Sequence, residues 1–132
     1  MNLIVRMPFP APELFPNRKN GKHWSATNAV KAKQHADGYN ATKAAGAFEM
    51  QDGYIPLSLL FLTPDGRKRD VDNMLAASKA LIDGMAQALG VDDRRFRPVF
   101  VDWVRGPNKA GLLIAGVGVQ QMAAALQFAG VK

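Results

Sequence analysis

Runs of apolar residues separated by polar turns predict four β-strands along the chain. Residues 3–7 (LIVRM) form a short β-branched and apolar run that a proline closes, and residues 54–62 (YIPLSLLFL) form a second run. Residues 98–104 (PVFVDWV) and 110–119 (AGLLIAGVGV) give two more. Because the connection between these last two runs, RGPNK, is short, we expect them to pair as a hairpin.

Two longer stretches have the composition or the spacing of a helix. Residues 23–48 are rich in Ala, Lys and Gln, which favour helix. Within residues 73–89, apolar positions recur at spacings of three, four and seven, which is typical of a helix with one buried face. Gly90 is the expected end of this second helix. A short further helix is expected over residues 120–130 (QQMAAALQFAG).

The resulting order of elements is β-α-β-α-β-β, which predicts a mixed α/β (α+β) layer fold. In such a fold two main helices pack on a small mixed sheet of about four strands. The length of 132 residues and the hydrophobic content of 48% are those of one globular domain. We therefore expect residues 1–132 to form a single domain.

Charge and cysteine content narrow the classes of function. The chain carries 17 Lys and Arg residues against 11 Asp and Glu residues, and the net charge of +6 favours polyanionic partners such as nucleic acid. The absence of cysteine excludes disulfides, zinc–thiolate sites and thiol nucleophiles. Arg6 and Pro8 interrupt the first apolar stretch, which is therefore too short for the hydrophobic region of a signal peptide or for a membrane span. A cytoplasmic location is the expectation.

Four aspartates flank the second predicted helix. Asp70 and Asp72 stand at its start, directly after a strand and its turn, and Asp92 and Asp93 follow its end. A group of carboxylates without thiols suits Mg²⁺ or Mn²⁺ rather than zinc, and a divalent ion relieves the repulsion between crowded charges. The alternative is structural: Asp72 is the N-cap of the helix, Asp70 is solvated, and residues 92–93 form a turn. Spacing alone leaves both interpretations open.

Cations stand beside both pairs of carboxylates in the sequence. We expect them to surround the carboxylates, so that they hold phosphates while a metal ion polarises the scissile phosphate and activates water. A basic loop near the N-terminus offers further phosphate contacts. The expected DNA-binding residues are Asn17, Arg18, Lys19, Lys22, Arg67, Lys68, Arg69, Arg94 and Arg95, with Arg97 beside the last two.

Lys79 is the candidate for transition-state stabilisation. At about 100° per residue, the seven steps from Asp72 leave Lys79 roughly 20° from the same face of a continuous helix. A lysine there can stabilise the charge that develops on a phosphate or orient the attacking water. The alternative is an ordinary solvent-exposed lysine.

These motifs together resemble the RusA family of Holliday junction resolvases, which are small phage-associated endodeoxyribonucleases. TPDGRKRDVDN looks like that family's basic run leading into an Asp-x-Asp-Asn motif, and LGVDDRRF resembles its Asp-Asp motif after the helix. FPNRKNGKHWS is similar to its N-terminal loop, and VRGPNKAGLLI to its closing hairpin. The resemblance runs over residues 3–119.

The resemblance implies roles for particular residues. Asp70, Asp72 and Asp93 would be the catalytic carboxylates that bind Mg²⁺, with Mn²⁺ as a substitute. Asn73 and Asp92 would support them. The family's lysine stands four residues after the second aspartate, where this chain has Ala76, and Lys79 follows three residues later. The segment KALID keeps the family's spacing of four between lysine and aspartate, which favours a shifted lysine over a lost one.

The resemblance also implies an activity and an assembly. The expected protein is a Mg²⁺-dependent endonuclease that cuts Holliday junctions or other branched DNA in recombination and repair, in a phage or prophage setting. A homodimer is expected, since a four-way junction is nearly two-fold symmetric and is cut in two strands. Two other functions remain open from the sequence: a non-catalytic protein that binds branched DNA, and a metal-dependent phosphohydrolase acting on nucleotides.

Overall fold

The sheet of the protein has four strands and mixed direction. The computed structural model describes residues 3–16, 24–47, 49–50 and 52–118. Its strands are β1 (Leu3–Met7), β2 (Ile55–Thr63), β3 (Phe96–Arg105) and β4 (Leu112–Val117). Their order across the sheet is β1-β4-β2-β3, with β2 parallel to β3 and β4 antiparallel to both β1 and β2. The predicted fold class, a mixed α+β layer fold, is confirmed.

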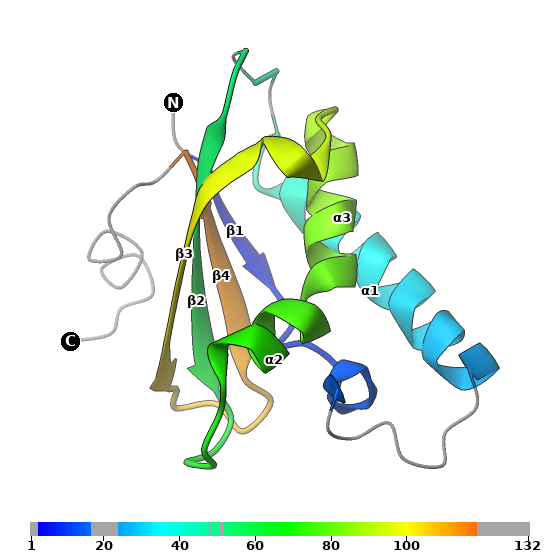
Figure 1. Ribbon diagram of the computed structural model, residues 1–132, viewed down its shortest axis with the longest axis vertical. Coiled ribbons are helices and arrows are strands. Elements are labelled where there is room, and N and C mark those ends of the chain that lie inside the picture. The colour runs from blue at the N-terminus through cyan, green and yellow to red at the C-terminus, as the bar shows by residue number, and fades with distance from the viewer. Residues whose placement is uncertain (1–2, 17–23, 48, 51, 119–132) are drawn as a thin grey trace.

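Three α-helices lie on one face of this sheet (Figure 1). They are α1 (Trp24–Ala44), α2 (Val71–Ala77) and α3 (Lys79–Leu89), and two 3₁₀ turns, η1 (Pro12–Leu14) and η3 (Asp93–Arg95), join them to the strands. Met74 of α2 and Leu81 and Met85 of α3 are fully buried against the sheet. Within the described residues, no helix combines the length and the hydrophobicity that crossing a membrane requires.

The predicted hairpin between the last two strands is wrong, because β2 lies between β3 and β4. Strands β2 and β4 are nearly continuous apolar runs, which are stable where both faces and both edges are covered. Strand β3 carries exposed Arg97, Asp102 and Arg105 and takes the edge. The connection crosses the end of β2, where the Gly106 N–H donates to the Thr63 carbonyl at 2.9 Å.

The predicted single helix over residues 73–89 is two helices, because Ser78 interrupts it. The backbone of Ser78 has φ −91° and ψ 0°, and its hydroxyl donates to the Leu75 carbonyl at 3.0 Å. A serine hydroxyl that bonds to the preceding turn in this way competes with the regular helical pattern. The expected end at Gly90 is confirmed, with φ 71° in the left-handed region. Since the helix is not continuous, the angle that related Lys79 to Asp72 does not apply. The helix expected over residues 120–130 lies outside the described residues.

Helices α1 and α3 touch through their backbones at two glycines. A Cβ at Gly38 would collide with the Leu81 carbonyl, and a Cβ at Gly84 would collide with the His35 carbonyl. Both obstacles are backbone atoms in helices, which cannot turn aside as a side chain can. The two helices must separate to admit even a methyl group.

Gly84→Ala is therefore expected to lower the free energy of unfolding by about 1–3 kcal/mol, as overpacking does, despite the better helix propensity of alanine. Urea denaturation followed by circular dichroism measures it. Gly66→Ala is the matched control, because its Cβ would meet only the Arg105 guanidinium at 3.5 Å. Equal stability of the two variants would show that the helices can move apart freely.

Candidate functional site

Lys79 lies between two carboxylates at the start of α3. Its ammonium donates to Asp83 Oδ1 at 2.8 Å and to Asp93 Oδ2 at 2.6 Å. Asp83 is one turn along the same helix, whereas Asp93 is the first residue of η3. The hydrogen bonds to Asp83 and then to Asp93 raise the pKa of Lys79 above its ordinary value. Two residues singled out from the sequence, Lys79 and Asp93, are thus in direct contact.

Asp83 is a member of this cluster that the sequence analysis did not assign. The spacing of four in KALID was noted as a family feature, and on a helix it also places the two side chains side by side. That spacing was the available signal. We refer to Lys79, Asp83 and Asp93 as the lysine cluster.

Asp92 has a different role from its neighbour Asp93. Its carboxylate caps η3 by accepting the Arg94 N–H at 2.9 Å and pairs with the Arg94 guanidinium at 2.9 Å. The hydrogen bond from the Arg94 side chain holds the pKa of Asp92 well below its usual range. The turn predicted for residues 92–93 in the structural alternative is present. Asp92 forms it, while Asp93 faces Lys79.

Asp70 and Asp72 lie at the N-terminus of α2. Asp70 occupies the cap position, where its carbonyl accepts the Met74 N–H at 3.1 Å, and its carboxylate makes no capping hydrogen bond. The alternative in which Asp72 is the N-cap is therefore wrong. Asp72 is exposed in the first turn, where the helix dipole favours a negative charge. Asn73 borders a small cavity together with Asp70.

The structure does not gather the three predicted metal ligands into one group. Across the described residues, no cluster of three or more His, Asp or Glu side chains is close enough to hold a metal ion. The donor chemistry nevertheless fits Mg²⁺, which commonly keeps several waters and binds through one or two carboxylates plus substrate phosphates. Asp83 and Asp93 already converge on one positive charge, the Lys79 ammonium. Because two carboxylates already face one positive charge here, the surroundings of Asp93 suit a bound cation.

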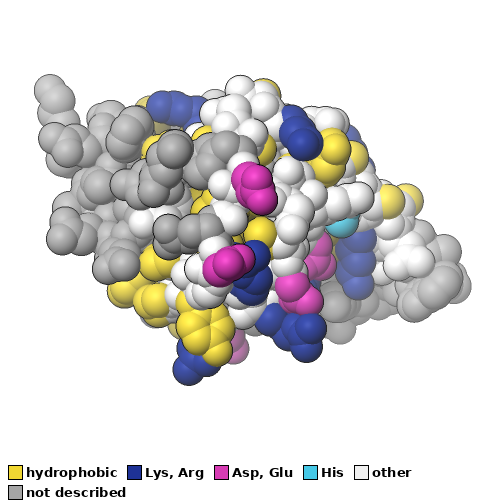
Figure 2. Space-filling model, turned by 90° about the horizontal axis from the view of Figure 1, so that it is seen from above, with side chains coloured by type: hydrophobic (Ala, Val, Ile, Leu, Met, Phe, Trp, Pro, Cys, Tyr) yellow, Lys and Arg dark blue, Asp and Glu magenta, His cyan; other side chains and the backbone are white. Residues whose placement is uncertain are grey.

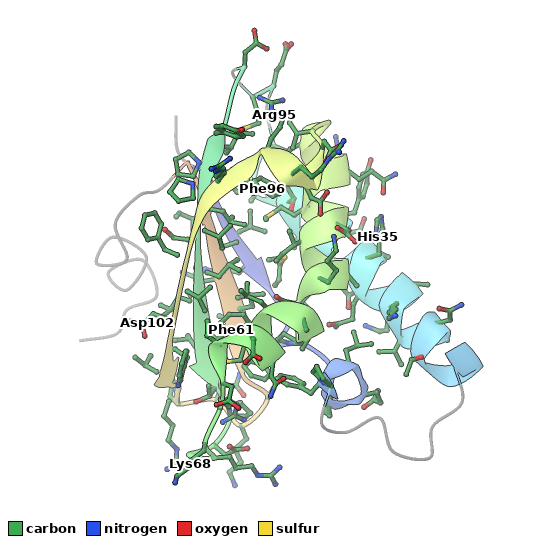
Figure 3. The ribbon with its side chains drawn as sticks, viewed as in Figure 1. His35, Phe61, Lys68, Arg95, Phe96 and Asp102 are labelled. Carbon is green, nitrogen blue, oxygen red and sulfur yellow. The ribbon has the colours of Figure 1, made fainter. Side chains whose placement is uncertain are left out.

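The two basic runs do not form one ring around the carboxylates. Figure 3 places Lys68 and Arg95 at opposite ends of the long axis of the molecule, because helices α2 and α3 span the distance between them. Arg69 is largely enclosed, with a side chain only 12% exposed that pairs with Asp65 at 2.9 Å. Arg67 and Lys68 are exposed beside Asp70, and Arg94 is exposed beside Asp93. The remaining predicted phosphate contacts, Asn17, Arg18, Lys19 and Lys22, lie outside the described residues.

The comparison with known proteins finds a relative of clear similarity. No protein-family model matches the chain. A protein of Xylella fastidiosa (strain Temecula1), described as an uncharacterized protein, is 36% identical over 123 residues, which cover 88% of this chain and 78% of that protein. The chain belongs to the same family as this protein. The match extends over most of both chains, so the relative is expected to share the sheet and the helices that hold the lysine cluster.

A cavity of about 470 Å³ adjoins the lysine cluster in this member of the family. Lys79 and Asp83 line it from α3, and Ala76 lines it from the end of α2. His35 borders it from α1, with its ring Nε2 2.5 Å from Gln87 Oε1. Ala76, the position at which the resemblance to the RusA family would place a lysine, lines the same cavity as Lys79. Positions 76 and 79 therefore border one cavity.

Proposed function

We propose that the protein is a Mg²⁺-dependent endonuclease of the RusA type that cuts Holliday junctions or other branched DNA. The observation that carries the proposal is the contact between Lys79 and Asp93, whose Nζ and Oδ2 atoms are 2.6 Å apart. The resemblance assigns catalysis to this aspartate and to a lysine, which it places at position 76, three residues before Lys79. Nothing in the separation of fourteen residues between Lys79 and Asp93 requires these two side chains to meet. A contact between the two is what a shared active site needs.

The chain's own groups have distinct tasks in this proposal. The resemblance assigns Mg²⁺, or Mn²⁺ in its place, to Asp70, Asp72 and Asp93, which do not form one group among the described residues. The ion would polarise the scissile phosphate and lower the pKa of a bound water. Lys79 has three N–H donors, and Asp83 and Asp93 use two of them. Its side chain is 62% exposed, so the third donor can reach a phosphate oxygen. Lys79 would thus hold Asp93 in place and stabilise charge on the phosphate.

The proposed substrate is consistent with the charge of the exposed surface. The net charge is +6, and exposed Arg67 and Lys68 stand beside Asp70. Because phosphate contacts release counterions, binding of DNA is expected to weaken steeply as salt is raised. With phage or chromosomal DNA as its substrate, the protein would act in the cytoplasm.

A homodimer is part of the proposal. Strand β3 lies at one edge of the sheet, and its side chains Val99, Phe100 and Trp103 are exposed by 42%, 37% and 36%. On the face drawn in Figure 2, apolar side chains gather at the lower left, while acidic, basic and scattered apolar side chains mix over the rest of the described surface in that view. An apolar edge of this kind suits an interface between two copies. Sedimentation equilibrium tests this assembly, and a monomer at all concentrations would count against it.

The central experiment uses a labelled synthetic four-way junction with and without Mg²⁺. The wild type is expected to cut it only with the metal, and Asp70→Asn and Asp72→Asn should each lower the rate roughly 10- to 100-fold, since each removes one of several charges that hold the ion. Asp37→Asn is the matched control, because Asp37 pairs with Lys33 on α1 at 2.9 Å and has no assigned role. The proposal fails if the purified protein cuts no branched DNA with either metal, or if Asp72→Asn cuts as fast as the wild type.

The same assay separates the two other functions. Tight binding of junctions in EDTA without cleavage on adding metal would identify a non-catalytic DNA-binding protein. Turnover of free nucleotides, together with DNA affinity that changes little with salt, would identify a nucleotide phosphohydrolase.

A further inference from the structure

A second concave site lies at the end of the sheet away from η3. Its volume is about 440 Å³, which is within the range of roughly 300–1,000 Å³ common for small-ligand sites. Four segments meet there: the chain after β1, the turn after β2, the approach to α2 and the turn before β4. The lining residues are Phe9, Pro10, Pro12, Phe15, Pro64, Arg67, Arg69, Lys109 and Ala110. We call this site the Phe15 groove.

The Phe15 groove is positively charged. Arg67, Arg69 and Lys109 line it, and none of the described residues that line it carries a carboxylate. The Arg69 side chain is fixed by its ion pair with Asp65 and by its position 5.7 Å from the centre of the Phe9 ring. Arg67 is 68% exposed and its Nε is 3.7 Å from Asp65, and Lys109 is exposed. Two cations of the groove therefore remain accessible to an anion.

One wall of the groove is aromatic and firmly held. The rings of Phe9 and Phe15 stack with centroids 6.1 Å apart and an interplanar angle of 18°. Phe9 also packs edge-on against Phe61, a fully buried core residue, at 6.2 Å. Anchoring in the core fixes the aromatic wall before any ligand arrives. Aromatic rings beside cations are the combination that binds single-stranded nucleic acid, since bases stack on the rings while the cations hold phosphates.

The groove continues to the candidate catalytic carboxylate Asp70. A smaller cavity of about 60 Å³ shares Phe15 and Arg69 with it. This cavity is also bordered by Lys68, Asp70 and Asn73. A strand whose base lies against Phe15 would thus direct its neighbouring phosphate toward Asp70.

We propose that the Phe15 groove binds one unpaired nucleotide of a DNA strand, adjacent to the phosphate that is cut. The adjacency to a cut phosphate rests on the proposed nuclease function, whereas binding of the unpaired nucleotide does not. A duplex keeps its bases within the stack and offers none to Phe15, so the groove selects DNA in which a base is free. Branched DNA with an unpaired base at the branch point offers such a base directly, whereas a fully paired four-way junction offers one only where a base pair is opened.

Binding in EDTA tests the groove apart from catalysis. Fluorescence anisotropy compares a fluorescein-labelled oligothymidylate with a blunt duplex of equal length, and the single strand should bind more tightly. Phe15→Ala is expected to weaken binding of the single strand roughly 5- to 150-fold, the range seen for loss of base–aromatic stacking. Lys109→Ala should lower the salt dependence of that binding by about 0.7 in the log–log slope.

Lys43→Ala is the matched control for charge. It removes the same positive charge from the last turn of α1, which Figure 1 shows at the other end of the molecule from the elements of the groove. Lys109 is exposed, so its variant keeps the test valid if Phe15→Ala unfolds in a circular dichroism melt. The inference is overturned if the duplex binds as tightly as the single strand, or if Lys109→Ala behaves like Lys43→Ala.

Cleavage assays on the same variants separate the two proposals. If groove variants lose single-strand binding while even the wild type cuts nothing with Mg²⁺, the nuclease proposal fails and the binding site stands. If the wild type cuts junctions and the groove variants bind and cut as well as it does, the groove proposal fails alone.

Discussion

Asp93→Asn is expected to lower the rate of junction cleavage by roughly 10²–10⁴, while junction binding in EDTA stays at the wild-type level. The ion that Asp93 would hold contributes several kcal/mol of charge stabilisation, and each 1.4 kcal/mol is a factor of about ten in rate. Asparagine keeps the shape of the side chain and can still accept a hydrogen bond from Lys79, so the fold should persist. Single-turnover cleavage of a labelled junction measures the effect.

Asp92→Asn is the control for this substitution. It removes a charge one residue away, yet asparagine is also a good N-cap and preserves the turn that Asp92 forms with Arg94. Its cleavage rate is expected to stay within a few-fold of the wild type. Equal losses in the two variants would mean that the charge of the turn matters rather than the carboxylate of Asp93.

Lys79→Ala is expected to lower the cleavage rate by roughly 10²–10³, the effect of removing one donor that stabilises transition-state charge. The double variant Ala76→Lys with Lys79→Ala should recover part of this loss, because positions 76 and 79 line one cavity. A melt by circular dichroism checks that both variants are folded. If Lys79→Ala cuts at the wild-type rate, the lysine is only a surface partner of Asp83 and Asp93.

The pH profile gives the lysine a second readout. The hydrogen bonds to Asp83 and then to Asp93 raise the pKa of Lys79 above its ordinary value, so the ammonium stays protonated as the pH rises from neutral into the mildly alkaline range. The wild-type cleavage rate should therefore not fall over this interval through loss of the charge on Lys79. If the cleavage rate of the wild type falls as the pH rises and that of Lys79→Arg does not, Lys79 loses its proton in this interval. That result would contradict a raised pKa of Lys79.

The fold class was accessible from the sequence because the apolar runs are strong. The strand over residues 3–7 was located to the residue, and β2 is displaced by one residue from its predicted range. The order of strands was not accessible, because a five-residue connection suggests a hairpin locally. The most apolar strands take the central positions, where both of their edges are covered. Strand β2 has eight of its nine residues buried and is central, whereas β3 lies at the edge.

The site was predicted in part for similar reasons. Lys79 and Asp93 were both assigned to one site from the sequence, and they are in contact. The prediction for Lys79, however, related it to Asp72 through a continuous helix, which Ser78 breaks. Serine has an acceptable helix propensity, so its hydroxyl bond to Leu75 could not be anticipated. Asp92 and Asp93 are indistinguishable by type, and only the direction of the turn assigns one to Arg94 and the other to Lys79.

The interruption at Ser78 frees the lysine from the helical phase of the aspartates before it. In one unbroken helix, positions three apart differ by only about 60° around the axis, so residues 76 and 79 would be neighbours there as well. Here the chain starts a new helix at Lys79, and residues 76 and 79 border the same cavity from two helices. The direction in which Lys79 points is therefore set by α3, and not by its number of residues from Asp72.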